Sequence, residues 1–179
     1  GLHRLAGTSP SKLLEVHGLV EATKQAFRIR DRHVTDPDYM TEDPRSFLRP
    51  DALDARARAI DPRRAAPWPH PSAHGDTVWL GAIDGEGRAI SFIQSLYWEF
   101  GSGVVLPESG ITWQNRGTSF SLEEPHLNHL RPGRRPFHTI QPALARLADG
   151  CTMVYGTMGG EGQPQTQAAV FARHVLHGQ

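Results

Sequence analysis

Cysteine, net charge and long apolar runs are what this chain has least of. Cys151 is the single cysteine among 179 residues, which excludes a disulfide framework and a cysteine metal site within the chain. Nineteen Lys and Arg side chains balance 19 Asp and Glu side chains, so no net charge attracts nucleic acid or an anionic membrane. No apolar run approaches the roughly 18 residues that a membrane-spanning helix needs. We therefore expect neither nucleic acid nor membrane as a partner.

The composition is that of an ordinary domain with many loops. The first residues lack an apolar signal core, so we expect a cytoplasmic protein, and we expect its true N-terminus to be absent from this chain. Hydrophobic residues make up 38% of the sequence, which is enough for a packed core. The 18 glycines and 14 prolines indicate loop-rich β structure.

The first sixty residues carry helical patterns. Ser9 can cap a helix and Pro10 suits its first position. Apolar residues then recur at helical spacing, at Leu13, Val16, Val20 and Phe27. Three residue-proline pairs mark residues 35–50 as a loop, and a second short helix is predicted over 51–60.

From residue 77 the pattern changes to strands. Residues 77–83 and 88–94 flank the turn sequence Asp-Gly-Glu-Gly, which predicts a β-hairpin. Both runs are apolar at most positions, as in a sheet that is covered on both faces.

The remaining elements follow from turn residues and periodicity. We predict a strand at 111–114, a surface loop at 121–136, a second hairpin from 143–147 and 152–155, and a closing helix at 165–176. This order of helices, sheet and helix fits a four-layer α/β sandwich better than a doubly wound fold.

Thr77 follows a stretch built like a processing loop. Residues 67–76 contain three prolines and show no apolar periodicity. If the Asp76–Thr77 bond is cut, Thr77 carries both a hydroxyl and a free α-amine, whose pKa of roughly 7.7–8 lets it accept the hydroxyl proton. If the bond stays intact, Thr77 is simply the first residue of a strand.

His70 and His74 in the same loop have a spacing that can suit a metal ion. A proline-rich loop supplies no helix to place both rings on one face, and no nearby Cys or Glu completes a site. We therefore expect no metal, and no cofactor.

The ordered motifs resemble the γ-glutamyltransferase (γ-glutamyltranspeptidase) family of N-terminal-nucleophile hydrolases. The motifs that carry the resemblance are Asp36-Pro37-Asp38-Tyr39, Phe100-Gly101-Ser102-Gly103, Ser109-Gly110-Ile111, Arg135-Pro136 and Gly156-Thr157-Met158-Gly159-Gly160. The resemblance implies a four-layer αββα sandwich of mixed α and β structure, incomplete in this chain. It also implies three segments: the helical end of a large subunit (1–66), a processing loop (67–76) and a small-subunit part (77–179).

The resemblance assigns the catalytic roles. Thr77 matches the nucleophile, with the cleavage site between Asp76 and Thr77. Ser95 matches a second hydroxyl that supports the nucleophile, and Gly159 and Gly160 match the glycine pair whose N–H groups stabilise an oxyanion.

The substrate-binding positions depart from the transferases. Ser119 stands where a carboxylate binds the substrate amine, and Arg116 stands at a nearby amide position. His138 and Thr139 replace a pair of serines, while Tyr97 replaces a small polar residue and narrows the pocket. Losing an acid and gaining a guanidinium favours a small acidic amide without an amino group. Oxamate fits this description, and the chain is most similar to a branch that includes oxamate amidohydrolase-like proteins.

Three functional hypotheses follow. The first is an autoprocessed amidohydrolase of small acidic amides, and the second is a γ-glutamyl hydrolase or transferase that acts on glutathione-like substrates. The third is an inactive fragment or non-catalytic module. The expected partners are the acidic amide and the remaining large-subunit segment of the same precursor. Assembly of processed heterodimers into a homo-oligomer is left open.

Overall fold

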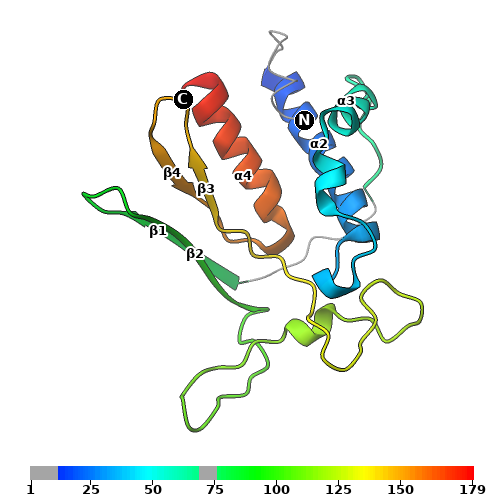
Figure 1. Ribbon diagram of the computed structural model, residues 1–179, viewed down its shortest axis with the longest axis vertical. Helices are drawn as coiled ribbons and strands as arrows, with labels where there is room; N and C mark the ends of the chain where they lie inside the picture. The colour runs from blue at the N-terminus through cyan, green and yellow to red at the C-terminus, as the bar shows by residue number, and fades with distance from the viewer. Residues whose placement is uncertain (1–11, 69–75) are drawn as a thin grey trace. The chain divides into compact units, whose positions relative to one another are not determined.

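A computed structural model describes residues 12–68 and 76–179 (Figure 1). The chain forms two compact units, one from residues 1–70, 121–137 and 168–179 and the other from residues 71–120 and 138–167. The first unit therefore contains residues from both sides of the expected cleavage position. The predicted division at 67–76 stays a prediction, because residues 69–75 lie outside the described residues.

Two helices dominate the first unit. Helix α2 (Lys12–His33) buries Leu19 and Phe27, and basic residues in its last turn complement the helix dipole. Helix α3 (Pro50–Arg58) begins at a proline, the residue that suits a first helical position because it needs no hydrogen-bond acceptor. Both predicted helices are confirmed, whereas the expected cap at Ser9 and Pro10 lies outside the described residues.

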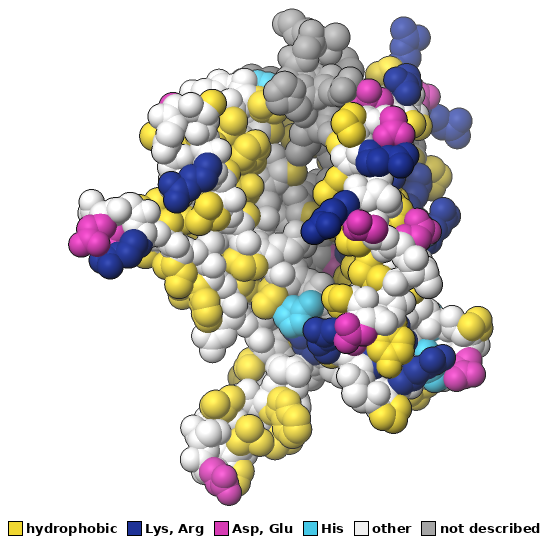
Figure 2. Space-filling view, viewed as in Figure 1, with side chains coloured by type: hydrophobic (Ala, Val, Ile, Leu, Met, Phe, Trp, Pro, Cys, Tyr) yellow, Lys and Arg dark blue, Asp and Glu magenta, His cyan; other side chains and the backbone are white. Residues whose placement is uncertain are grey.

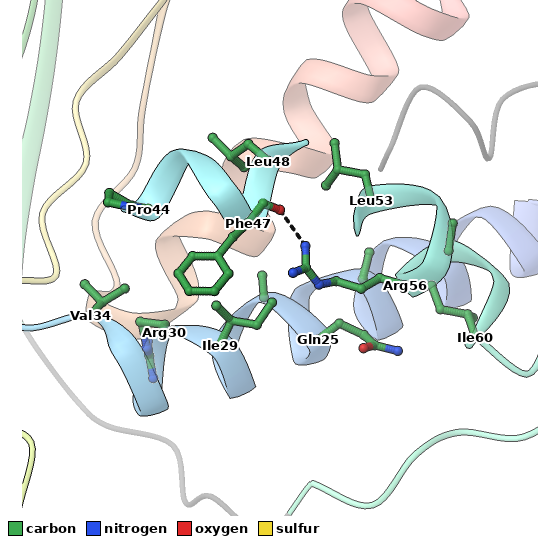
Figure 3. Close-up of a pocket in the computed structure, with 13 residues that line it drawn as sticks. Gln25, Ile29, Arg30, Val34, Pro44, Phe47, Leu48, Leu53, Arg56 and Ile60 are labelled. Atoms are coloured by element: carbon green, nitrogen blue, oxygen red, sulfur yellow. Dashed lines mark hydrogen bonds between the residues drawn. The ribbon is translucent and has the colours of Figure 1, made fainter. Parts of the chain in front are cut away.

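An apolar cavity of about 330 Å³ lies between α2, α3 and the short 3₁₀ helix η2 (Pro44–Leu48). Figure 3 shows Ile29, Val34, Phe47 and Leu53 around it. At its edge the Arg56 guanidinium donates a hydrogen bond to the Phe47 carbonyl oxygen at 2.5 Å, which ties α3 to η2.

The second unit is built on the predicted hairpin of β1 (Asp76–Ile83) and β2 (Ala89–Tyr97). The Asp84 side chain accepts hydrogen bonds from the backbone of Glu86 and Arg88, and Gly87 takes a left-handed φ of 79° that closes the turn. A second hairpin, β3 (Ala143–Arg146) and β4 (Thr152–Tyr155), is likewise confirmed.

The two hairpins pack through Trp79. Its indole Nε1 donates to Ser91 Oγ at 2.9 Å, and Ser91 Oγ donates to the Tyr155 carbonyl oxygen at 3.4 Å. Gly156 lies so close that a Cβ atom there would stand 2.2 Å from the Trp79 ring. Glycine at this position therefore lets β4 approach the first hairpin.

Within the described residues only one face of the first hairpin is covered, so the expectation of a sheet covered on both faces stays a prediction. Alternate residues face opposite sides of a strand, so Thr77 and Trp79 share the face toward the second hairpin. The opposite face exposes its apolar side chains by 44–52%, at Val78, Leu80, Ile90 and Phe92. Figure 2 shows hydrophobic side chains along this hairpin. The apolar pattern indicated a covered surface, but within the described residues the second hairpin packs on the other side.

Residues 111–114 do not form the predicted strand. The described structure has an isolated bridge between Val105 and Thr112, within a long loop that folds back on itself through Trp113 N–H and the Val104 carbonyl. The run is short and lies between Gly110 and Asn115. In the described structure it forms a single bridge and not a continuous strand pairing. Residues 121–136 form a loop as predicted.

The chain closes with α4 (Gln163–Phe171) and a π-helical turn (Ala172–Leu176), which confirms the closing helix and starts it two residues early. Gln163 is fully buried, and its Oε1 accepts the backbone N–H of Gln141 at 3.1 Å. No helix in the described ranges combines the length and the apolar content needed to cross a bilayer.

Candidate active site

Thr77 lies at the start of β1 with its side chain half-buried. It pairs with Ser95 in the strand ladder, and its hydroxyl donates a hydrogen bond to Ser95 Oγ at 3.0 Å. The two hydroxyls that the sequence singled out are therefore brought together by the register of the hairpin.

A β-bulge stands at the predicted cleavage position. Asp76 pairs with Tyr97, but Thr77 pairs with Ser95, so Leu96 has no partner in the ladder. The Leu96 carbonyl oxygen accepts the Asn115 N–H at 3.1 Å instead. Bulges of this kind re-aim side chains next to active sites. The irregularity falls on the Asp76–Thr77 bond itself.

Tyr97 carries the backbone strain of the bulge. Its φ is +81°, a left-handed value that costs a non-glycine residue about 1–3 kcal/mol. Its N–H donates to Ser95 Oγ at 2.9 Å, so Ser95 Oγ accepts from both Thr77 and Tyr97. This pair of donors fixes the Ser95 hydroxyl beside Thr77.

Arg116 is the least expected member of the site, because its guanidinium is charged and only 3% of the residue is exposed. It begins the 3₁₀ helix η3 (Arg116–Ser119). One Nη donates to Thr139 Oγ1 at 3.2 Å, and the guanidinium lies 4.8 Å from the centre of the Tyr97 ring. Its Nη2 has no hydrogen-bond partner among the described residues. Burial lowers the pKa of Arg116, and the neighbouring Tyr97 acts in the opposite direction.

Ser119 and His138 are two further residues predicted to bind the substrate. Ser119 Oγ is buried and has no hydrogen-bond partner within residues 12–68 and 76–179. Burial and the positive charge of Arg116 lower the pKa of His138, so its imidazole is neutral at neutral pH. The arrangement has buried donors and one uncompensated positive charge, which suits an anionic ligand.

Gly159 and Gly160 follow β4 and take left-handed φ values of 106° and 51°. Gly159 precedes a 3₁₀ turn at residues 160–162 that leads into α4. Gly156, three residues earlier, packs against Trp79. In the described structure no hydrogen bond joins either glycine to Thr77 or Arg116, so the oxyanion role stays a prediction.

The backbone just before the processing loop is tied to α2. Lys24 Nζ donates to the Ala66 carbonyl oxygen at 2.7 Å, and Glu21 Oε2 accepts the Ala66 N–H at 3.2 Å. The Trp68 ring packs on Phe27 with 5.8 Å between ring centres. The structure thus holds the chain up to residue 68, and the remainder of the predicted loop, with His70 and His74, lies outside the described residues.

A family model for gamma-glutamyltranspeptidase matches residues 2–179. The chain belongs to the gamma-glutamyltranspeptidase family. The resemblance read from the ordered motifs is therefore confirmed.

Named relatives refine this membership. The oxamate amidohydrolase proenzyme of Klebsiella pneumoniae is 58% identical over 91% of this chain and 31% of its own length. The glutathione hydrolase-like YwrD proenzyme of Bacillus subtilis is 43% identical over 90% of this chain and 31% of its own length. The solved cephalosporin acylase of Bacillus halodurans has a TM-score of 0.81 and 37% identity, and the match covers 93% of this chain and 30% of that chain. The chain spans about a third of the length of these relatives.

These matches confirm the predicted fold class, mixed α and β structure of the N-terminal-nucleophile hydrolase type. Five of the residues predicted for the site fall into two groups that share Tyr97. One group is Thr77, Ser95 and Tyr97, and the other is Tyr97, Arg116 and Thr139. The groups of three or more acidic, His or Cys side chains that a metal needs are absent from the described residues.

The sequence reasoning missed Asn115 as a site residue. Its Oδ1 accepts the Trp98 N–H at 3.1 Å while its own N–H bonds the bulged Leu96, so one residue holds both ends of the bulge. A hollow of about 380 Å³ lies against it, lined by Trp98, Glu99, Phe100, Gly101 and Asn115. A bulge leaves no sequence signal that would have given Asn115 a role.

Proposed function

We propose that this chain is the nucleophile-bearing part of an autoprocessed amidohydrolase that cleaves the amide of a small acidic substrate. The observation that carries the proposal is the hydrogen bond from Thr77 Oγ1 to Ser95 Oγ at a bulge that falls on the Asp76–Thr77 bond. Intramolecular cleavage requires a hydroxyl held next to the carbonyl carbon that it attacks, and the Thr77 hydroxyl belongs to the residue that follows this carbonyl. Family membership and the proenzyme relatives support the same reading.

The Thr77 hydroxyl is the nucleophile of the proposed processing step. Thr77 Oγ attacks the Asp76 carbonyl carbon, and the hydroxyl proton passes to the departing Thr77 nitrogen. The peptide bond becomes an ester between the Asp76 carbonyl and Thr77 Oγ. Water hydrolyses this ester, which leaves a carboxylate on Asp76 and a free hydroxyl and amine on Thr77.

Turnover repeats the chemistry on an external amide. The neutral Thr77 amine accepts the proton of its own hydroxyl as Oγ attacks the substrate carbonyl, and the amine of the amide leaves as ammonia once protonated. Water then hydrolyses the acyl ester. Ser95 orients Thr77 Oγ, and the Gly159 and Gly160 N–H groups stabilise the oxyanion, a contribution of about 3–4 kcal/mol per donor in acyl transfer.

The buried guanidinium of Arg116 sets the substrate class. An unpartnered Nη2 in a site without a paired carboxylate among the described residues favours a substrate that brings its own carboxylate. Ser119 offers a hydroxyl instead of the acid that a substrate amine would need. Oxamate has a carboxylate, an amide and no amino group, and the 58% identical relative is named for that substrate.

A mass spectrum and two assays test the proposal. We expect the purified protein to contain one polypeptide that begins at Thr77, and we expect Thr77→Ala to leave the chain uncut and inactive. Ammonia release from oxamate should exceed release from a γ-glutamyl anilide. Turnover of the anilide alone would favour a γ-glutamyl hydrolase. The 43% identical relative that is named glutathione hydrolase-like supports this second candidate. An uncut and inactive chain would favour the non-catalytic reading of this segment.

A further inference from the structure

Asp36 is a buried carboxylate three residues after the end of α2. Its exposed fraction is 3%. Its Oδ1 accepts the nearby Asp38 N–H at 3.3 Å, and its other donors come from Arg135, 99 positions later in the chain. Oδ2 accepts the Arg135 backbone N–H at 2.8 Å, and Oδ1 accepts Arg135 Nε at 3.0 Å. Arg135 Nη2 lies 2.9 Å from Asp36 Oδ1 and donates to Asp38 Oδ2 at 2.9 Å. One arginine thus joins two carboxylates of the segment that follows α2.

The neighbouring residues repeat the connection. Arg134 Nη2 donates to Thr35 Oγ1 at 2.8 Å, and Thr35 Oγ1 donates to Asn128 Oδ1 at 2.7 Å. The Arg134 guanidinium lies 4.4 Å from the centre of the Tyr39 ring. Two arginines in succession therefore bind two successive residues, Thr35 and Asp36, of the segment after α2.

The contacts of Arg134 and Arg135 with Thr35, Asp36 and Asp38 all cross the position of the proposed cut, so this inference rests on the proposed function. Thr35, Asp36 and Asp38 precede Thr77, whereas Arg134 and Arg135 follow it. All five lie in the first compact unit. Cleavage before Thr77 turns these contacts from links within one polypeptide into links between two.

We propose that Thr35, Asp36, Asp38, Arg134 and Arg135, named here the Asp36–Arg135 clasp, hold the two polypeptides together after processing. The partner that this surface fits is the other polypeptide of the same precursor. Charge-assisted hydrogen bonds to one carboxylate from both a backbone N–H and a guanidinium are strong and geometrically specific. Separation would leave the Asp36 carboxylate without these donors, which opposes dissociation.

Cleavage before Thr77 makes the clasp a contact between two polypeptides, so their association depends on protein concentration. In the intact precursor the chain keeps both sides of the clasp at high effective concentration, so a weakened clasp costs little association. In the processed protein the same weakening lets the polypeptides separate on dilution. The clasp should therefore matter far more after cleavage than before it.

The test compares Asp36→Asn in the processed protein and in a Thr77→Ala background that stays uncut. Native mass spectrometry and size-exclusion chromatography over a dilution series measure separation of the two polypeptides. We expect Asp36→Asn to raise the dissociation constant of the processed pair about tenfold or more. In the uncut background it should leave the elution volume and the far-ultraviolet spectrum unchanged, which shows that the variant folds.

The matched control is Asp51→Asn, because the ion pair of Arg49 and Asp51, at 2.9 Å, is exposed and lies wholly before the cut. This control should leave the dissociation constant unchanged. Arg135→Lys keeps the charge but loses the forked geometry, and an intermediate dissociation constant is expected. Equal separation of wild type, Asp36→Asn and Asp51→Asn would overturn the clasp.

A protease recognition sequence placed at residues 69–75 separates this proposal from the proposed function. Cutting there with added protease makes two polypeptides even if Thr77 never cleaves its own bond. Absence of a natural Thr77 terminus would refute autoprocessing alone. If the protease-cut pair separates equally easily with and without Asp36→Asn, the clasp is refuted alone.

Discussion

Arg135 in the first compact unit and Arg116 in the second show two opposite uses of a guanidinium. The Arg135 side chain is 62% exposed, yet it is paired with Asp36 and Asp38. Arg116 is 3% exposed, and within the described residues it has a hydroxyl and an aromatic ring as neighbours but no paired carboxylate. The pKa of Arg135 is raised by its hydrogen bond to Asp36, whereas burial lowers the pKa of Arg116.

The difference in pairing distinguishes an arginine with a structural role, Arg135, from one suited to bind an anionic ligand, Arg116. A paired arginine at the surface has its charge compensated by the fold, so it stabilises contacts between segments. A buried arginine without an acid keeps an uncompensated charge, which costs stability until an anion arrives. Such groups accumulate at functional sites.

The largest expected effect comes from removing the buried charge. Arg116→Met should lower kcat/KM for oxamate about 100-fold, because a charge-assisted hydrogen bond of about 1.5–3 kcal/mol is lost. Arg135→Met, assayed in the processed protein at a concentration that keeps the two polypeptides associated, should change kcat/KM less than threefold. Steady-state kinetics on both variants checks this contrast, and equal losses would remove the distinction between the two arginines.

Acid should release the clasp in a way that depends on Asp36. The backbone N–H of Arg135 is the largest cause of the lowered pKa of Asp36, with the guanidinium adding to it. A lowered pKa in the folded state means that the stabilising contribution is present above the ordinary value of about 4 and is lost as pH falls through the lowered value. Wild type and Asp36→Asn should thus differ about tenfold in polypeptide affinity at pH 7, and the difference should shrink as the pH falls below about 4. Native mass spectrometry across this range measures it, and a constant difference would contradict the role of the Asp36 charge.

Replacing each of the two arginines by Met should change the free energy of unfolding in opposite directions. Replacing buried Arg116 by Met removes a desolvated charge, so we expect the free energy of unfolding to rise by about 1 kcal/mol. For a protein of this size that corresponds to roughly 2–4 °C in Tm. Arg135→Met should lower Tm instead. Calorimetry without substrate gives both values, and a fall for Arg116→Met would show that its charge is compensated in the unliganded protein.

The smallest expected effect on kcat/KM comes from replacing Tyr97, whose ring contacts Arg116 as the ring of Tyr39 contacts Arg134. Tyr97→Leu should lower kcat/KM for oxamate about fivefold, because a guanidinium–ring contact is worth about 0.5–2 kcal/mol. Tyr97→Phe keeps the ring and should retain wild-type kinetics. Tyr39→Leu removes the matching ring under Arg134 in the other unit and should leave kcat/KM unaltered. A loss with Tyr97→Phe as large as with Tyr97→Leu would indicate that the hydroxyl, not the ring, acts.

Local patterns predicted the local structure. Helical spacing gave α2 and α3, and the Asp-Gly turns gave both hairpins, because these elements depend on neighbouring residues. The Thr77–Ser95 pairing also follows, since the turn fixes the register of the hairpin that carries both residues.

Features that depend on distant contacts were not predicted. The bulge at Leu96 and the left-handed Tyr97 are set by Asn115, which reaches them from a loop almost twenty residues away. Asp36 and Arg135 are 99 residues apart, and the sequence around each of them gives no indication of its partner. Residues 111–114 had a strand-like composition, yet a strand requires a neighbour that the sequence alone does not supply.

The uncovered face of the first hairpin has a practical consequence for anyone who produces this segment alone. Val78, Leu80, Ile90 and Phe92 form an apolar surface on a sheet of two strands, whose outer edges carry unpaired backbone groups within the described residues. Flat apolar strands with open edges are templates for aggregation. Recombinant material should therefore precipitate as concentration rises, and charged substitutions such as Leu80→Lys should keep it in solution.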